Sequence, residues 1–169
     1  NTPIDILVVG SNTSDIALQA TKIAGVARVL SADATHLAHP IAEDIANLIM
    51  SIGSEYQIIM AAHSSFSRNV LPRVAALLDV AMISDALEIQ ANQTYIRSIY
   101  AGNVLSTIQS TDAIQVLTVH GSNFAAAATN GNAQIESLVA PTAFNKTRWG
   151  SENLTQSDRP EINSVKVKS

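Results

Sequence analysis

Residues 4–33, which read IDILVVGSNTSDIALQATKIAGVARVLSAD, decide the fold of this chain. The apolar run at residues 4–9 ends at Gly10 and is typical of a buried strand. Ser14 can cap a helix, and Gly25 suits its C-terminal stop. One face of that helix is expected to carry Ile16, Ala20 and Ile23. Residues 26–33 read as a second strand, so the stretch predicts a β-α-β unit.

The same alternation continues to residue 80. Pro40 opens a second helical pattern that Gly53 ends, and residues 57–65 predict a third buried strand that runs into a polar loop. Residues 69–80 predict a third helix with Pro72 in its first turn. The buried face of the second helix is expected to carry Ile41, Ile45, Leu48 and Ile49. The order predicts a parallel sheet with right-handed crossovers.

Short, closely spaced strands then replace this pattern. They are expected at residues 86–91, 94–101, 104–109 and 114–120. Their polar turns indicate antiparallel hairpins added to the parallel sheet. The fold class is therefore a three-layer α/β domain with a mostly parallel sheet and added antiparallel strands. This domain is expected at residues 1–128. Residues 129–169 are expected to form an extended arm that ends in the strand-like VKVKS.

Composition excludes several classes of protein. Of the 169 residues, 47% are hydrophobic and 14% are charged. The net charge is −4 and there is no run of Lys or Arg, so nucleic-acid binding has no electrostatic support. Cysteine is absent, which excludes disulfides and thiolate metal sites. No run approaches the roughly 18 apolar residues of a membrane helix, and no signal peptide is visible. Because the chain starts at Asn1 and enters a strand almost at once, a preceding segment is expected.

Four isolated features could carry chemistry, but each has a plainer interpretation. The turn Gly10-Ser11-Asn12 follows a strand as phosphate-binding turns do, yet it lacks G-x-G-x-x-G. His36 and His39 could share a metal, but no third ligand has suitable spacing. Glu43 and Asp44 suit the positive end of a helix better than catalysis. Ser64, Ser65 and Ser67 lack a G-x-S-x-G elbow. We predict no catalytic, cofactor-binding or metal-binding residue in this chain.

The loop of residues 63–69 follows a buried strand and precedes a helix. In an open α/β sheet the ligand crevice lies at the carboxyl ends of the strands. The loop offers serine hydroxyls and helix N–H groups to an anion, and Arg68 adds a positive charge. A helix cap with a surface arginine explains the same residues, and both interpretations stay open.

Five segments, taken in order, resemble the alpha subunits of electron-transfer flavoproteins. Residues 66–78, FSRNVLPRVAALL, are similar to the family's G-K-N-x-L-P-R-V-A-A-x-L segment. The others are residues 22–30 (KIAGVARVL), 83–85 (ISD), 97–103 (RSIYAGN) and 154–161 (LTQSDRPE). Together they cover nearly the whole chain, and they imply a fold like that of the adenine nucleotide alpha hydrolases.

The chain also departs from the family. Ser67-Arg68 stands where Gly-Lys is usual, and His120 stands where an arginine is common, so a permanent charge there is in doubt. The family has one more strand and helix before residue 4. It continues beyond residue 169 into S-G-G-R-G and a flavin-binding domain. The resemblance therefore implies a fragment of the amino-terminal domain, with FAD held by the full-length protein outside this chain.

The resemblance implies a scaffold and docking role in an electron carrier, not an enzyme. The expected partners are the beta subunit in a heterodimer, acyl-CoA and other dehydrogenases as electron donors, and a membrane quinone oxidoreductase as acceptor. The expected location is the cytoplasm in bacteria and the mitochondrial matrix in eukaryotes, without membrane insertion. The residues expected at a partner or domain interface are Phe66, Arg68, Asn69, Tyr100, Gly102 and Asn103.

Two rival functions remain. A small-nucleotide-binding protein of similar α/β fold would need a glycine-rich phosphate loop near the end of the chain. A hydrolase that uses Ser64 or Ser65 would need a base facing the serine, and His63 is only adjacent in sequence.

Overall fold

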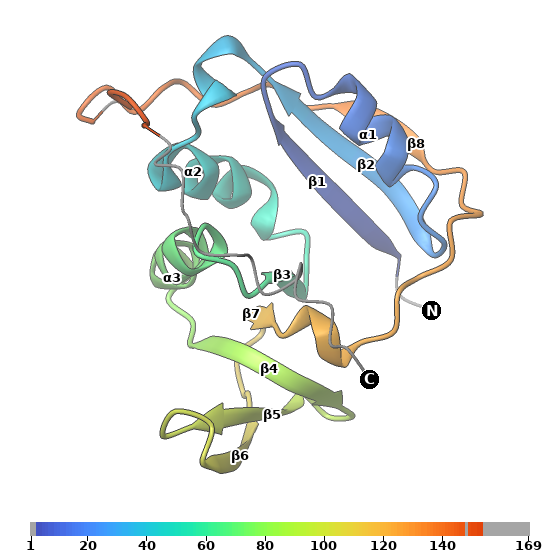
Figure 1. The fold of residues 1–169 in the computed structure, drawn as a ribbon, viewed down its shortest axis with the longest axis vertical. Coiled ribbons are helices and arrows are strands. Elements are labelled where there is room, and N and C mark those ends of the chain that lie inside the picture. The colour runs from blue at the N-terminus through green and yellow to red at the C-terminus, as the bar shows by residue number, and fades with distance from the viewer. Residues whose placement is uncertain (1–2, 148, 154–169) are drawn as a thin grey trace, which may run out of the picture.

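Two β-sheets organise the residues that the computed structural model describes, which are 3–147 and 149–153 (Figure 1). The first sheet has the order β1-β2-β8, with β1 at Ile4–Gly10, β2 at Val26–Asp33 and β8 at Gln134–Ser137, all parallel. The second has the order β3-β7-β4-β5-β6. Its strands are Ile58–Ala62 (β3), Gln115–Val119 (β7), Met82–Gln90 (β4), Thr94–Ile99 (β5) and Val104–Gln109 (β6). The α/β class with mostly parallel pairing and added antiparallel strands is confirmed.

Helix α1, Ser14–Ala20, covers one face of the first sheet. Ala17 and Ala20 pack against Val8 and Val29, which lie on that face. The expectation that Ile16 faces the core is wrong, because 60% of its surface is exposed. A helix turns about 100° per residue, so a face through positions 17 and 20 leaves position 16 to one side.

Helices α2, Ala42–Gly53, and α3, Ser67–Leu78, lie side by side (Figure 1), with α2 on the opposite side of the first sheet from α1 and α3 against β7 and β4 of the second sheet. Alternate β1 residues Leu7 and Val9 point to this side and pack against the α2–α3 core. A short 3₁₀ helix, Thr35–Ala38, adds a buried leucine. The main buried side chains of this core are Leu37, Ile45, Ile49, Val70, Leu71, Val74 and Val116.

Helix α3 starts two residues before the predicted position. Pro72 therefore lies in its second turn, not in its first as expected. Asp79 ends the helix in the left-handed conformation with φ 56°, and the Val80 N–H donates to the Ala75 carbonyl at 3.0 Å. This is the hydrogen-bonding pattern of a left-handed C-terminal cap.

Strand β7 does not form the expected antiparallel hairpin with β6. It inserts between β3 and β4 and runs parallel to both. Residues 115–118 of β7 are all buried, whichever face they point to. Burial on both faces is typical of a central parallel strand, so the residues of β7 suit this place better than an exposed hairpin.

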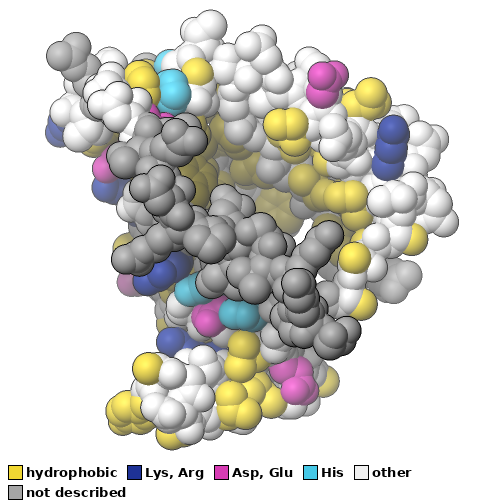
Figure 2. Space-filling model, in the orientation of Figure 1, with side chains coloured by type: hydrophobic (Ala, Val, Ile, Leu, Met, Phe, Trp, Pro, Cys, Tyr) yellow, Lys and Arg dark blue, Asp and Glu magenta, His cyan; other side chains and the backbone are white. Residues whose placement is uncertain are grey.

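Strand β3 is not the fully buried strand that its apolar sequence predicts. Among the described strands it pairs only with β7, and no pairing joins it to β1 of the other sheet. As a result Ile58 is 49% exposed and Met60 is 53% exposed. A hollow with hydrophobic side chains on its inner surface lies beside this edge (Figure 2). A sequence suited to the middle of a sheet therefore lies at an edge.

Residues 121–147 lead from β7 back to the first sheet. A 3₁₀ turn at Gly121–Asn123 is followed by β8, which pairs with β2 through Arg28–Gln134 to Ser31–Ser137. Part of the expected arm thus extends the sheet, and the domain boundary after residue 128 stays a prediction. The VKVKS strand expected at the end lies outside the described residues. No helix of the described part of the chain is long and apolar enough to cross a membrane.

Candidate functional site

The turn between β1 and α1 binds a carboxylate of the chain itself. Asp33, at the end of β2, accepts hydrogen bonds from the Asn12 N–H at 3.0 Å and from the Thr13 N–H at 2.7 Å. The Thr13 hydroxyl donates to the same carboxylate at 2.9 Å. These bonds, with that from the Thr13 backbone foremost, hold the pKa of Asp33 below its ordinary value. Two backbone N–H groups at the end of this turn, those of Asn12 and Thr13, are therefore already engaged.

The loop of residues 63–69 also engages its own helix start. The Ser64 hydroxyl accepts a hydrogen bond from the Ser67 N–H at 3.1 Å, and the Ser64 carbonyl accepts one from the Arg68 N–H at 3.0 Å. The Asn69 N–H donates to the Phe66 carbonyl at 3.0 Å. These contacts support the helix-cap interpretation, because they use the donors on which an anion site would depend. The Arg68 side chain is exposed and makes no ion pair with another described residue.

A chain of polar side chains connects the carboxyl ends of β3 and β7 to the interior of β4. The ring Nδ1 of His63 lies 2.9 Å from the Thr118 hydroxyl, which also accepts the Asp85 N–H at 2.9 Å. The Asp85 carboxylate lies 2.9 Å from Nδ1 of His120. Asp85 has φ 57° where the β4–β7 register shifts, so backbone geometry as well as hydrogen bonds positions it.

Sequence reasoning missed Thr118 and Asp85 as members of one cluster. The signal was present, since polar residues follow the apolar cores of both segments, VLTVH and MISD. What the sequence did not reveal was that β7 lies between β3 and β4, which brings His63 and Thr118 next to Asp85 of β4. The His63 ring bonds to Thr118 through Nδ1, and the bonds of the Ser64 hydroxyl among the described residues are to Ser67 and not to this ring.

The predicted turn at residues 100–103 joins β5 to β6. Tyr100, Ala101 and Gly102 have positive φ values of 51°, 54° and 90°. The Asn103 side-chain amide donates to the Tyr100 carbonyl at 2.9 Å, which closes the turn. Tyr100 itself is 77% exposed, so its ring is available to another molecule.

The six predicted interface residues form two separate groups. Phe66, Arg68 and Asn69 follow the carboxyl end of β3. The turn at residues 100–103 follows β5, which runs antiparallel to β4 and therefore ends toward the amino end of β4. Since β3, β7 and β4 are parallel, the two groups lie toward opposite ends of the second sheet.

The other candidate residues have structural contacts. His39 stacks on Trp149, with ring centroids 3.8 Å apart and planes within 5°, and neither it nor His36 belongs to a group of three metal-ligating side chains among the described residues. Glu43 pairs with Arg73 at 2.7 Å. The Asp44 carboxylate accepts the Phe144 N–H at 2.7 Å. These carboxylates tie α2 to α3 and to the segment after β8.

The described residues do not fit the pyrophosphate of the flavin that the resemblance implies. A dinucleotide cradle needs free backbone N–H groups reached through glycine. A Cβ at Gly131 would lie 2.3 Å from the Ile23 carbonyl oxygen. This glycine therefore lets another part of the chain's own backbone come close, and not a ligand. Its N–H donates to the Lys22 carbonyl at 2.7 Å. The N–H groups of Asn12 and Thr13, which follow Gly10, are likewise engaged, by the Asp33 carboxylate.

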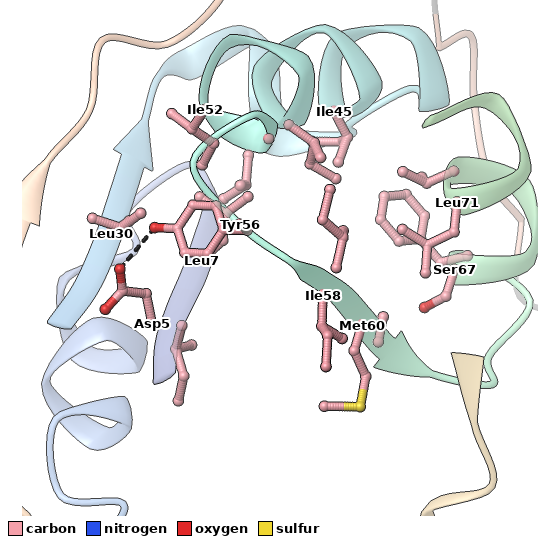
Figure 3. A pocket seen from close by; sticks show the side chains of 18 of the residues that line it. Asp5, Leu7, Leu30, Ile45, Ile52, Tyr56, Ile58, Met60, Ser67 and Leu71 are labelled. Atoms are coloured by element: carbon pink, nitrogen blue, oxygen red, sulfur yellow. Dashed lines mark hydrogen bonds between the residues drawn. The ribbon is translucent and has the colours of Figure 1, made fainter. Parts of the chain in front are cut away.

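An ionic network ties the first sheet to the loop before β3. Arg28 of β2 pairs with Asp5 of β1 at 2.6 Å and with Glu136 of β8 at 2.9 Å. The Tyr56 hydroxyl donates to the Asp5 carboxylate at 2.7 Å (Figure 3). The Arg28 hydrogen bond lowers the pKa of Asp5 against the opposing effect of burial. Burial, followed by the bond to Asp5, raises the pKa of Tyr56 to about 12.

Comparison with known proteins identifies relatives over almost the whole chain. Residues 1–143 match the sequence model of the electron transfer flavoprotein domain. The electron transfer flavoprotein subunit alpha of Pseudomonas aeruginosa is 41% identical over 165 residues, which are 97% of this chain and 53% of that protein. The subunit of the same name from Paracoccus denitrificans is 37% identical over 96% of this chain and 53% of its own length.

A eukaryotic relative shows the same partial coverage. The probable mitochondrial electron transfer flavoprotein subunit alpha of Caenorhabditis elegans is 36% identical over 97% of this chain and 50% of its own length. The chain thus spans about half the length of the curated relatives that it matches.

Proposed function

This chain belongs to the electron transfer flavoprotein family, with alpha subunits as its relatives, and from that premise we propose that it is the scaffold and partner-docking part of an electron carrier. The observation that carries the proposal is the family match over residues 1–143. The polar groups at the strand ends also bond mainly to one another, which suits a scaffold better than a reaction centre. In this proposal the chain itself catalyses no reaction.

The flavin of the carrier is FAD, and polypeptide outside the described residues holds it. The backbone N–H groups of Thr13 and Ser67 already donate within the chain, which supports this assignment. The same engagement argues against the small-nucleotide-binding alternative, which would need such donors free.

The beta subunit of the same carrier is the direct partner. Dehydrogenases, including those that act on acyl-CoA, supply electrons to the assembled protein, and a quinone oxidoreductase accepts them. The exposed rings of Phe66 and Tyr100 and the exposed Arg68 provide docking groups at two ends of the second sheet. The proposed location is the cytoplasm for a bacterial protein and the mitochondrial matrix for a eukaryotic one.

Hydrogen exchange with and without the beta subunit tests the docking role. We expect slower amide exchange at residues 100–130 in the complex. Tyr100→Ala should weaken the complex, whereas Leu18→Ala, which removes an exposed side chain on α1, is the matched control. Unchanged exchange at residues 100–130, in a mixture shown to contain the complex, would overturn this assignment of the interface. Absence of any complex would overturn the docking role itself.

A further inference from the structure

Beyond β8 the chain forms a strap, residues 138–147, that runs toward the amino end of α2 (Figure 1). The strap contains no helix or strand. Its first N–H group, that of Leu138, donates to the Ser31 carbonyl of β2 at 2.8 Å. Among the described residues, one further hydrogen bond joins the strap to the rest of the chain, from Phe144 to Asp44. A segment held by so few hydrogen bonds can open while the sheets stay folded.

A buried carboxylate makes the first contact that holds the strap. Asp44 lies in the first turn of α2 and is only 4% exposed. Its Oδ1 accepts the hydrogen bond from the Phe144 N–H at 2.7 Å. The positive end of the helix favours the charged carboxylate at this place. Loss of the donor would leave a buried acceptor without its partner, which is costly, so the bond holds the strap against α2.

A stack of two rings makes the second contact, just beyond the strap. The Trp149 indole lies on the His39 imidazole, with ring centroids 3.8 Å apart and planes within 5°. Trp149 is 47% exposed and His39 is exposed, so the stack lies at the surface and outside the core. Pro40 follows His39 and disfavours the helical region for its backbone, which restricts the position of the imidazole. The stack therefore ties the chain after the strap to the loop before α2.

The two contacts have matching spacing. Phe144 and Trp149 are five positions apart in the sequence, and so are their partners, Asp44 and His39. Each contact holds one end of the same short stretch of chain, so the first to form reduces the conformational entropy that the second must overcome. We propose that the two contacts form one clasp, which opens and closes as a unit and fastens the strap over the amino end of α2.

A closed clasp fixes the place on the domain from which the chain continues. The curated relatives contain about as many residues again as the part that this chain matches. The clasp would therefore set where that further polypeptide begins, and an open clasp would release this starting point. The contacts lie within this chain, so the clasp can be absent while the docking role stands.

The chain has a single tryptophan, so its fluorescence reports the stack alone. In the 169-residue chain, His39→Ala removes the stacked ring, and the emission of Trp149 should shift to longer wavelength as water reaches the freed face. If the clasp is one unit, the same variant should also speed amide exchange at Phe144 by about two- to tenfold, although its acceptor is unchanged. His39→Tyr keeps a ring that can stack and should preserve the exchange rate. The control, His36→Ala, removes an exposed ring of the 3₁₀ helix just before and should change neither signal.

Substitution of Asp44 tests the coupling from the other end. Asp44→Ala removes the acceptor of the Phe144 N–H, and the emission of Trp149 should shift although His39 is unchanged. Asp44→Asn retains an acceptor oxygen and should keep the emission of the unchanged chain. Because Asp44 is buried, the decision rests on the exposed His39 if either variant fails to fold. The clasp is overturned if His39→Ala shifts the emission but leaves exchange at Phe144 unchanged, which would show two independent contacts. It is also overturned if His39→Ala leaves the emission unchanged.

Discussion

Single residues near the strand ends satisfy one another and leave little for a ligand. The Asp33 carboxylate accepts hydrogen bonds from N–H groups of the turn before α1. The Ser64 hydroxyl accepts one from the first N–H group of α3. Thr118 is fully buried and joins His63 to the Asp85 backbone. Hydrogen bonds of this kind fix local geometry, and each removes a donor or acceptor that a nucleotide would need.

A single glycine fixes the exposed turn between β5 and β6. Because Gly102 has φ 90°, a side chain there is strained although space is open around it. Gly102→Ala should lower the free energy of unfolding by about 1–2 kcal/mol in urea denaturation. Gly121→Ala is the control, since that glycine has open space and no positive φ, and it should stay within about 0.5 kcal/mol. Equal effects of the two substitutions would contradict the assigned turn.

The raised pKa of Tyr56 predicts a pH dependence of stability. An acid with a folded pKa above its ordinary 10.0 keeps its proton longer in the folded state. The stability it contributes is complete below about pH 10 and is lost as pH rises toward about 12. Burial also raises the pKa of Tyr95, so the comparison must isolate Tyr56. The unfolding free energy of Tyr56→Phe should fall less steeply over this range than that of the unchanged chain, and identical slopes would refute the prediction.

The serine loop should bind adenosine monophosphate weakly or not at all. Its helix N–H groups already donate within the loop, and Arg68 offers one exposed charge without a built pocket. Isothermal titration calorimetry should detect no binding in the micromolar range. Micromolar binding that Arg68→Ala abolishes would show that the loop is a nucleotide site.

Sequence reasoning located many of these residues but not their partners. The loop of residues 63–69 and the turn at residues 100–103 were identified from strand ends and from Gly102. The contacts of Asp85, Thr118 and His120 were not, because they join segments more than 30 residues apart. Only the order of strands in the sheet brings such segments together, and a local pattern does not encode that order.

At the scale of elements, the local patterns predicted the first two strands and the second helix well. They misplaced β7, because short strands with polar turns indicate hairpins, whereas its burial on both faces suits a central position. From helical spacing they also predicted a buried face of α1 with Ile16, Ala20 and Ile23. Ala20 is buried as expected, but Ala17 lies beside it in the core and Ile16 does not. The choice between helix faces depends on how closely α1 approaches the sheet, which is a tertiary property.

The short 3₁₀ helix at Thr35–Ala38 should be essential to the core although only one of its residues is buried. Leu37 is fully buried between the sheet and helices α2 and α3. Leu37→Ala should cost about 2–4 kcal/mol of unfolding free energy, because it leaves a cavity. Leu18→Ala removes the same atoms from a side chain that is 55% exposed and should cost no more than about 0.5 kcal/mol. Similar losses in thermal or urea unfolding would show that this core is wrongly assigned.

For the whole molecule, the α/β class followed from the alternation of strands and helices, but the division into two sheets did not. The sequence of β3 is that of a central strand, and its exposed Ile58 and Met60 result from the open edge beside it. An unpaired apolar edge also favours association between molecules, so the isolated chain should be prone to aggregate. Light scattering of the unchanged chain and of Met60→Lys, which places a charge at this exposed edge, would measure this tendency, and equal scattering would exclude the edge as its cause.

Gel filtration monitored by both protein and flavin absorbance tests the central claim, which is that this chain docks in an electron carrier without holding its flavin. The chain is incubated with FAD, alone and with the beta subunit. Alone, it should elute without colour, because the N–H groups of Asn12, Thr13 and Ser67, which a pyrophosphate could use, already donate within the chain. With the beta subunit it should elute earlier, as a complex. A chain that elutes alone with a stoichiometric amount of FAD, or that never joins the beta subunit, would contradict the account.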